Sequence, residues 1–297
     1  MKLKKMLALT MAGLLAAGLT ACGSTADTSA APAAESTEAA GAPDGDGDPT
    51  TLTVAMECAY APYNWTQSDD SNGAVAIRGS SDYAYGYDVM MAKKIGEALG
   101  QKVQIVKLDW DSLIPAVMTG DVDCVIAGQS ITAERAAQVD FSDPYYYASI
   151  VTLTKKDSTY ASAASVADLT GATATSQLGT IWYDACLPQI ENANILPAQE
   201  TAPAMLVALN SGACDIVVTD RPTAQAALVA YPDFTLLDFG GGDNDFKVSE
   251  EDINIGISMK KGNTALQSAI NEVLSTMTAD DYNAMMDDAI SVQPLSK

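Results

Sequence analysis

The chain contains no histidine, and this absence excludes several kinds of chemistry. Without an imidazole there can be no His-ligated metal site and no nucleophile activated by a histidine base. Positive charge is also scarce, with 16 Lys and Arg against 38 Asp and Glu and a formal net charge of −22. An acidic surface argues against nucleic acid or anionic lipid as partners and fits a protein whose copies repel one another.

Long apolar runs are missing beyond the N-terminus, so no later stretch is expected to span a bilayer. Three lysines precede an apolar run at 6–19 and small residues follow, which is typical of a secretory signal peptide. The ending LTAC (19–22) resembles the bacterial lipobox, in which the cysteine is lipidated. We therefore predict a lipoprotein signal peptide over 1–21 and lipidation of Cys22. The alternative is an ordinary signal peptide with an incidental cysteine.

Residues 23–49 lack aromatic and large aliphatic side chains and consist of Ala, Ser, Thr, Pro, Gly, Asp and Glu. Such a segment cannot bury enough apolar surface to fold. We predict that 22–49 form a lipidated, disordered tether with an end-to-end distance of roughly 30 Å. Losing residues 1–21 removes three lysines and makes the net charge −25.

Cysteine is sparse after Cys22, and the four that remain show no metal-type spacing: Cys58, Cys124, Cys186 and Cys214. Cys124 and Cys214 lie in apolar, strand-like runs and are expected to be small buried residues. A disulfide is possible in an exported protein, but the sequence does not pair these cysteines. We expect no metal and no cofactor.

The remaining chain, 50–297, is long enough for two small lobes. Strand-like and helical runs alternate along its first part, with strands expected at 51–56, 101–108 and 123–128 and helices at 86–100 and 111–120. Asp88 is a plausible N-cap of the first helix and Gly100 a plausible stop. This alternation predicts an α/β fold.

One segment recurs later in the chain. PAVMTGDVDCVIAG (115–128) aligns with VALNSGACDIVVTD (207–220) at a constant offset of 92, and a strand-like run with a glycine turn (171–180) precedes the second copy. We therefore predict two similar lobes. At this offset Gly128 and Asp220 end equivalent strands, and ligands of open α/β sheets bind at the carboxyl ends of the strands.

Arg135 stands in GQSITAERAAQVDFSDPYY (128–146), just after a helix start signalled by Ser130 and Thr132. The helix dipole disfavours a cation in the first turn, so this arginine needs an explanation. Gly128 allows close backbone approach, the helix start has free N–H groups, and a guanidinium fork suits a carboxylate. The segment predicts an anion site. Alternatively, Arg135 pairs with an acidic neighbour on the surface.

Five segments together resemble the bacterial extracellular solute-binding proteins of family 3, the amino-acid receptors of ABC importers. They are GYDVMMAKKIGEALG (86–100), WDSLIPAVMTG (110–120), VDCVIAGQSITAERAAQVDFSDPYY (122–146), QLGT (177–180) and GACDIVVTD (212–220). The resemblance implies an α/β, two-lobed type II periplasmic-binding-protein fold with a central cleft and a two-strand hinge. Lobe 1 would comprise 50–149 plus 254–297 and lobe 2 150–253.

The resemblance also implies how an amino acid is held. Arg135 would bind the α-carboxylate, aided by Ser130 and the backbone around Thr132. Asp220, from the other lobe, would bind the α-ammonium, with Gly128 offering its carbonyl. Opposite charges on opposite walls suit a zwitterion, and each pairing strengthens as closure removes water. Asp220 can also be a helix N-cap, because a proline follows at the first helical positions.

Side-chain recognition is implied for aromatic positions and for the second-lobe loop, namely Tyr60, Tyr63, Trp110, Gln177, Gly179 and Thr180. Packing within a lobe is the alternative for the aromatic residues. Glu57 follows the first strand, and a carboxylate there would favour a polar or cationic amino acid. The segment 64–85 is longer than the family's usual hairpin and could reshape the pocket. Trp182 closes over the ligand or simply packs.

These features predict the extracytoplasmic substrate-binding component of an amino-acid ABC importer. It would be a monomer that binds a free amino acid and the importer's permease, touches the membrane only through its lipid anchor, and is not an enzyme. One alternative is a cyclohexadienyl dehydratase-like enzyme, for which Glu57 is the only candidate general acid. Another is a sensory amino-acid receptor, which would need a fused transmembrane signalling segment.

Overall fold

The computed structural model describes residues 48–294. The predicted signal peptide, Cys22 and nearly all of the predicted tether lie outside the described residues. Within 48–294, no helix combines the length and the apolar character that crossing a bilayer requires.

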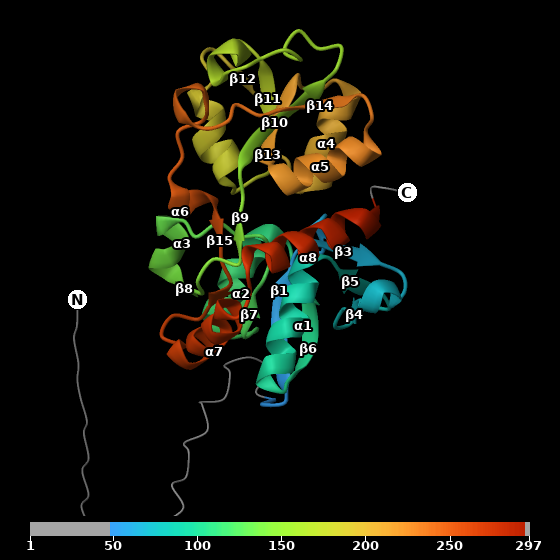
Figure 1. Ribbon diagram of the computed structural model, residues 1–297, viewed down its shortest axis with the longest axis vertical. Helices are drawn as coiled ribbons and strands as arrows, with labels where there is room; N and C mark the ends of the chain where they lie inside the picture. Colours follow the sequence, from blue (N-terminus) through green and yellow to red (C-terminus); the bar gives the residue numbers. More distant parts are fainter. Residues whose placement is uncertain (1–47, 295–297) are drawn as a thin grey trace, which may run out of the picture. The chain divides into compact units, whose positions relative to one another are not determined.

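Two five-stranded mixed sheets form the centres of two lobes (Figure 1). The first sheet has the order β6 (Lys102–Lys107), β1 (Thr51–Met56), β7 (Cys124–Val125), β16 (Ser258–Met259) and β8 (Asp140–Phe141). The second has the order β12 (Asn194–Ile195), β11 (Thr173–Thr175), β13 (Ile216–Asp220), β10 (Ile150–Lys155) and β14 (Phe234–Leu237).

Helices pack against both sheets. They are α1 (Tyr87–Leu99), α2 (Leu113–Thr119), α3 (Ala133–Gln138), α4 (Ala202–Ser211), α5 (Arg221–Ala230), α6 (Glu250–Ile253), α7 (Thr264–Ser275) and α8 (Ala279–Val292). Helices α1, α2 and α7 belong to the first lobe, while α4 and α5 lie beside the strands of the second (Figure 1). Helix α8 contacts α1 of the first lobe and α5 of the second.

The predicted internal repeat is confirmed by topology. In each sheet, the first three strands in spatial order run parallel and the last two pairings are antiparallel. The repeated aspartates play the same part in both lobes. Asp123 Oδ2 accepts the Thr53 N–H at 2.7 Å, and Asp215 Oδ2 accepts the Thr173 N–H at 2.8 Å.

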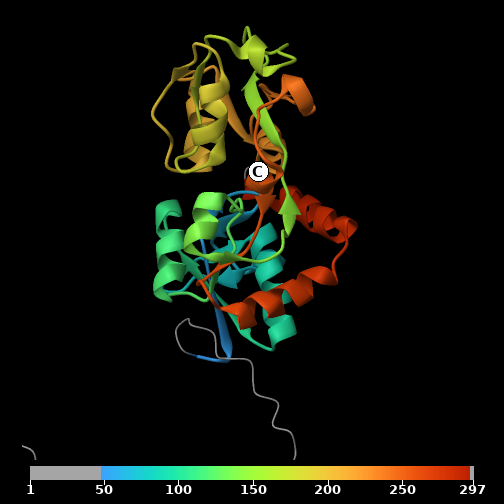
Figure 2. The same cartoon turned by 90° about the vertical axis from the view of Figure 1, so that its left-hand side faces the viewer.

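Two short strands, β9 (Tyr146–Tyr147) and β15 (Asn254–Ile255), pair antiparallel. In the sequence, each follows a strand of one five-stranded sheet and precedes a strand of the other. Figure 2 shows the chain passing between the lobes in this region. The lobe boundaries predicted from the resemblance, 50–149 plus 254–297 for lobe 1 and 150–253 for lobe 2, stay a prediction.

Several local predictions need correction. Asp88 is not an N-cap: Gly86 occupies that position, and Asp88 lies fully buried in the first turn of α1. Gly100 does end this helix, in the left-handed conformation. The strand expected at 123–128 contains only Cys124–Val125 in the ladder, because the chain then turns towards the Gly128 loop.

The long segment 64–85 forms most of a small sheet of order β2 (Ala59–Tyr60), β3 (Asn64–Gln67), β5 (Tyr83–Tyr85) and β4 (Val75–Ala76). A parallel bridge between Ile77 and Ile105 joins it to the edge of the first sheet. None of its residues lines the two cavities described below.

The four cysteines of the described chain are all free thiols, so no disulfide forms among them. Cys124 and Cys214 are buried as predicted, at 0% and 4% exposure. Residues 48–294 contain no cluster of three potential metal-ligating side chains.

Candidate ligand-binding site

Arg135 reaches from the first lobe to the second. Its helix begins after Thr132, whose hydroxyl accepts the Arg135 N–H at 3.3 Å. The guanidinium donates from Nη1 to the Ser130 carbonyl at 3.0 Å and from Nη2 to the Gly179 carbonyl at 2.9 Å. It also lies 5.4 Å from the centre of the Trp110 ring, within cation–π range. These bonds use two of its five N–H donors, so three remain for a carboxylate.

The alternative of a surface ion pair for Arg135 is wrong. Within residues 48–294 Arg135 forms no salt bridge, and Asp140 pairs with Lys261 instead at 3.7 Å. Burial lowers the pKa of Arg135, an effect opposed by the negative charges of Glu134 and Asp184.

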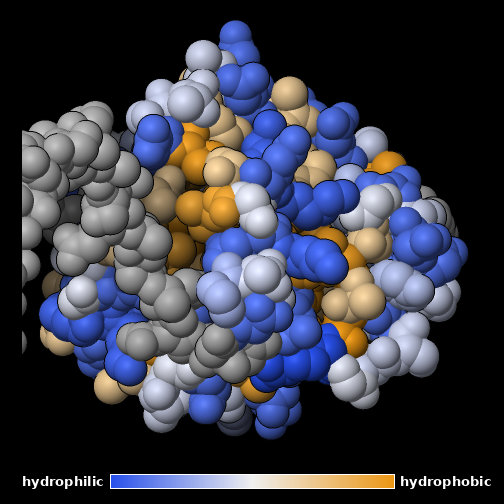
Figure 3. All heavy atoms as spheres, turned by 90° about the horizontal axis from the view of Figure 1, so that it is seen from below, coloured by the Kyte–Doolittle hydropathy of each residue, from blue (hydrophilic) through white to orange (hydrophobic). Residues whose placement is uncertain are grey.

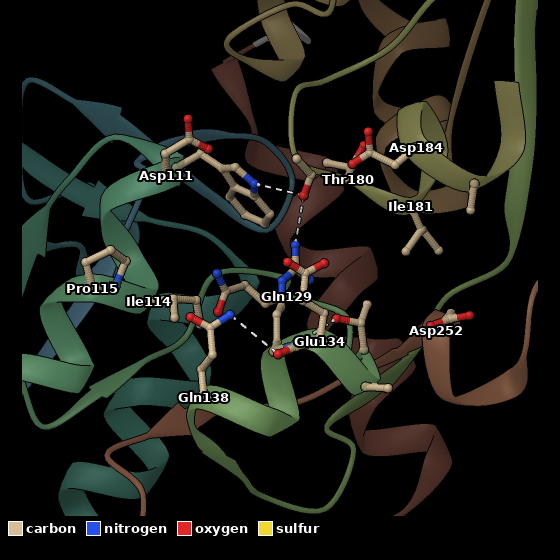
Figure 4. Close-up of a pocket in the computed structure, with 16 residues that line it drawn as sticks. Asp111, Ile114, Pro115, Gln129, Glu134, Gln138, Thr180, Ile181, Asp184 and Asp252 are labelled. Atoms are coloured by element: carbon tan, nitrogen blue, oxygen red, sulfur yellow. Dashed lines mark hydrogen bonds between the residues drawn. The ribbon is translucent and has the colours of Figure 1, made fainter. Parts of the chain in front are cut away.

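Both lobes line the cavity in front of this guanidinium, which has a volume of about 620 Å³. The first lobe contributes Trp110, Asp111, Ile114, Pro115, Gln129, Thr132, Ala133, Glu134, Arg135 and Gln138. The remaining lining residues are Gly179, Thr180, Ile181, Asp184, Ala185 and Asp252. Figure 4 shows Ile114 and Pro115 on one side of the cavity and Thr180, Ile181 and Asp184 on the other.

Asp220 ends β13 and caps α5. Its Oδ1 accepts the Thr223 N–H at 2.9 Å, and its Oδ2 accepts the Thr223 hydroxyl at 3.0 Å. The Tyr60 hydroxyl, from the other lobe, donates to Oδ2 at 2.5 Å. The residue is 1% exposed, and burial raises its pKa. No cation in the described chain pairs with this carboxyl, although a buried carboxylate strongly favours a charged partner.

The N-cap role of Asp220 is therefore confirmed, and its ligand role stays a prediction. Asp220 does not line the Arg135 cavity, and its Oδ2 is bonded to the Tyr60 hydroxyl.

Aromatic rings and a glycine pack tightly around this point. Tyr60 stacks on Tyr63 with ring centres 4.7 Å apart, and Trp182 of the second lobe approaches Tyr60 at 6.1 Å. Gly128 has φ +63°, and a Cβ there would lie 2.6 Å from Tyr60 Cε1. The site therefore requires glycine at position 128, for its conformation and for space.

Glu57 is a second buried carboxyl in this region, at 3% exposure. Its Oε2 accepts from the Gln177 side-chain amide of the second lobe at 3.2 Å, and its Oε1 has no hydrogen-bond partner among residues 48–294. Burial raises its pKa to about 7. Gln177 is held in turn by the Thr180 hydroxyl, which donates to the Gln177 carbonyl at 2.8 Å.

Glu57 lines a smaller cavity of about 330 Å³. The other lining residues are Asp109, Trp110, Asp111, Ser112, Leu178, Glu200 and Thr201. This lining contains four carboxyl groups and no cation, and it shares Trp110 and Asp111 with the Arg135 cavity. A positively charged group is the ligand chemistry that suits such a lining.

The structure thus groups the predicted site residues into three neighbouring clusters. Arg135 lies with Ser130, Thr132, Trp110 and Gly179; Asp220 with Tyr60, Tyr63 and Gly128; and Glu57 with Gln177 and Thr180.

Sequence reasoning missed Asp111, Glu200 and Asp184. Asp111 follows Trp110 directly and could have been noticed there. No motif marks Glu200 or Asp184 in the sequence, because these residues reach the cavities only when the two lobes come together.

Two similar lobes with interlobe cavities define a type II periplasmic-binding-protein fold. The sequence profile of the bacterial extracellular solute-binding proteins, family 3, matches residues 52–289. The chain belongs to this family.

Individual relatives resemble the chain at moderate identity. The arginine-binding extracellular protein ArtP of Bacillus subtilis (strain 168) is 34% identical over 130 residues, which cover 44% of this chain and 45% of ArtP. The match therefore spans less than half of the length of ArtP.

Solved structures cover more of the chain. An ancestral arginine-binding protein bound to arginine has 30% identity and a TM-score of 0.64, covering 80% of this chain and 97% of that one. The ancestral amino-acid-binding protein AncCDT-1, a precursor of cyclohexadienyl dehydratase, has 30% identity and a TM-score of 0.66, covering 81% and 96%.

Proposed function

We propose that this protein is the extracytoplasmic substrate-binding component of an amino-acid ABC importer and that it closes its two lobes around a free amino acid with a cationic side chain. The observation that carries the proposal is the pair formed by Arg135 and Asp220. They are a guanidinium and a carboxylate on different lobes, and each reaches the opposite lobe through a hydrogen bond. A free amino acid presents the complementary carboxylate and ammonium.

In this proposal Arg135 binds the α-carboxylate with its remaining N–H donors, and Ser130 and Thr132 complete the anion site. Asp220 binds the α-ammonium, with the Gly128 carbonyl beside it. The Tyr60 hydroxyl now bonded to Asp220 moves aside or shares the carboxylate with the ammonium. Ligand contacts made only when the lobes are together favour closure.

The cationic preference is supported by Glu57 and its surroundings. Its Oε1 is buried without a partner, and a guanidinium or ammonium there would restore the missing interaction. Gln177 positions Glu57, while Trp110 and Tyr63 flank the ligand's side chain, and Gly179 and Thr180 close it from the second lobe. The names of ArtP and of the arginine-bound ancestral protein point to the same class of ligand.

We propose that residues 1–21 are removed as a signal peptide and that lipid on Cys22 tethers a monomer outside the cytoplasmic membrane, within reach of its permease. Palmitate labelling that disappears in Cys22→Ala would support this anchor, and equal labelling of both proteins would exclude it.

The test is calorimetry against the twenty amino acids, ornithine and cystine. We expect arginine, lysine or ornithine to bind, and ligand at one hundred times its Kd should stabilise the fold by about 2.7 kcal/mol. Arg135→Ala and Asp220→Ala should each abolish binding and leave the circular dichroism spectrum unchanged. Near-wild-type affinity in either variant would refute the roles proposed for Arg135 and Asp220.

A second candidate is a dehydratase-like enzyme. Glu57, a buried carboxyl whose burial raises its pKa to about 7, has the property of a general acid at neutral pH. AncCDT-1 shows the same fold in a lineage that leads to such an enzyme. Chromatography after incubation distinguishes the two, because a binding protein returns its ligand unchanged and an enzyme converts cyclohexadienyl substrates.

A further inference from the structure

We propose that Asp88 is a positioning residue that fixes two of the loops that form the ligand-binding region of the first lobe, the loop after β1 and the loop after β7. The inference rests on the proposed function of these loops, which follow the parallel strands β1 and β7. Asp88 itself belongs to α1 and lines neither cavity.

The carboxyl of Asp88 is completely buried and accepts two side-chain hydrogen bonds. The Asn64 amide donates to Oδ2 at 2.7 Å, and the Tyr145 hydroxyl donates to Oδ1 at 2.6 Å. Hydrogen bonds from Tyr145 and Asn64, together with the backbone N–H of Gly128, oppose the rise in the pKa of Asp88 that burial causes, so the carboxylate depends on these donors. Asn64 and Tyr145 each form a second hydrogen bond, Asn64 to the loop after β1 and Tyr145 to the loop after β7.

The first arm runs through Asn64 to the loop after β1. With its amide nitrogen directed at Asp88, Asn64 turns its Oδ1 to the Cys58 N–H, at 2.7 Å. Cys58 has φ +54°, an unfavourable conformation for a residue with a side chain, so this bond helps to hold it. Cys58 lies between Glu57 and Tyr60, and its backbone therefore sets the direction of both.

The second arm runs through Tyr145 to the loop after β7. With its proton directed at Asp88, the Tyr145 hydroxyl accepts the Gly128 N–H at 3.0 Å. Gly128, with φ +63°, lies against the Tyr60 and Tyr63 rings. Tyr145 is itself fixed, because its ring stacks on Tyr87 at 5.7 Å and its carbonyl accepts the Tyr87 hydroxyl at 2.6 Å.

The ionised state of Asp88 fixes the donor-to-acceptor direction of the hydrogen bonds in both arms. An ionised carboxylate only accepts hydrogen bonds, so both neighbours must donate to it and present their oxygen atoms to the two loops. The amide of an asparagine at position 88 would place its N–H donors against either the Asn64 amide nitrogen or the Tyr145 hydroxyl. In the first orientation Asn64 would have to rotate its amide and the Cys58 N–H would lose its acceptor; in the second the Tyr145 proton would lose its acceptor.

This polarity allows a rescue experiment. In the double variant that combines Asn64→Asp with Asp88→Asn, the new amide donates to the new carboxylate, which still accepts the Cys58 N–H. The side-chain oxygen of the asparagine introduced at position 88 would face the Tyr145 hydroxyl as before, so every hydrogen bond of the network is preserved. Tyr145→Phe, in contrast, removes only the arm to Gly128.

We expect Asp88→Asn and Tyr145→Phe each to weaken arginine binding by about tenfold, the effect of one buried hydrogen bond. The double variant should return to within about twofold of wild type. Amide hydrogen exchange should quicken at Cys58 or at Gly128 in Asp88→Asn, and at Gly128 in Tyr145→Phe. The matched control is Tyr282→Phe, which removes the 3.1 Å bond to the Leu274 carbonyl between α7 and α8 and should change only stability.

Wild-type affinity in both single variants, losses no larger than in Tyr282→Phe, or a double variant as weak as Asp88→Asn would overturn the inference. If Asp88→Asn fails to fold, Tyr145→Phe decides alone. If the wild-type protein binds no amino acid, the proposed function fails instead, and exchange at Cys58 and Gly128 still tests the positioning role.

Discussion

Folding and ligand binding favour different protonation states of Glu57. Burial raises its pKa from an ordinary value of 4.5 to about 7. Between these values the folded state holds a proton that the unfolded state has lost, so this group's contribution to stability falls as pH rises from about 4.5 to 7. A cationic ligand requires the ionised form and should bind better as pH rises through 7.

We therefore predict that Glu57→Gln raises Tm at pH 8, weakens arginine binding there by more than tenfold, and flattens the pH dependence of affinity. Differential scanning calorimetry and titration calorimetry from pH 5.5 to 8.5 measure these quantities. A variant that keeps the wild-type pH dependence would show that another group controls binding.

Gly128 offers a second residue-scale test, because it combines a left-handed backbone with a close contact. Gly128→Ala should cost more than the roughly 1 kcal/mol of a left-handed alanine, since the new Cβ would lie 2.6 Å from Tyr60 Cε1. Gly171→Ala is the matched control, with φ +79° and no atom within 4 Å of the added Cβ. Chemical denaturation should give the larger loss for position 128, with weakened ligand binding only there. Equal losses in the free energy of unfolding would mean that the Tyr60 ring moves away from the new Cβ at little cost.

At the scale of elements, predictions succeeded where the signal was local. Helix α1 and its Gly100 stop follow from apolar periodicity and from the left-handed preference of glycine. Asp88 is not the cap that an aspartate near a helix start predicts, because a buried network holds it inside the first turn. The strand at 123–128 was overestimated because its apolar residues are buried in a loop as well as in the ladder.

The repeated aspartates, Asp123 and Asp215, each accept a hydrogen bond from the N–H of a strand residue, and the contribution of this bond can be tested at Asp215. Asp215→Ala would leave the strand N–H of Thr173 without its 2.8 Å partner, and we expect a loss of about 1 kcal/mol. The loss should appear as a lower midpoint in urea, with arginine affinity within about twofold of wild type, because the bond lies at the far end of β11 from Gln177. Asp215→Asn, which keeps an acceptor, serves as the control and should lose less. A large fall in affinity would show that this strand end controls the site.

At the scale of the whole molecule, the sequence identified the groups of the site but not their connections. Arg135, Asp220 and Glu57 stand in recognisable segments, so their chemical roles could be predicted one at a time. The bonds from Arg135 to the Gly179 carbonyl and from Tyr60 to Asp220 join residues 44 and 160 positions apart. Such contacts depend on how two lobes meet, which no local pattern encodes.

Hydrophilic residues cover much of the face seen in Figure 3, as the acidic composition predicts.

The position of the three tryptophans makes closure observable. Trp110 donates to the Gly179 carbonyl at 3.4 Å and Trp182 lies beside Tyr60, so both are in the interlobe region. Trp65 packs against Tyr85 in the small sheet, away from both cavities. Because the proposed closure would change the surroundings of Trp110 and Trp182 but not those of Trp65, we predict that arginine alters the intrinsic fluorescence of the wild type and of Trp65→Phe equally. The change should disappear in Trp110→Phe/Trp182→Phe, with calorimetry confirming that this double variant still binds arginine at the concentration used. A signal that persists there and vanishes in Trp65→Phe would place the ligand-linked motion in the small sheet.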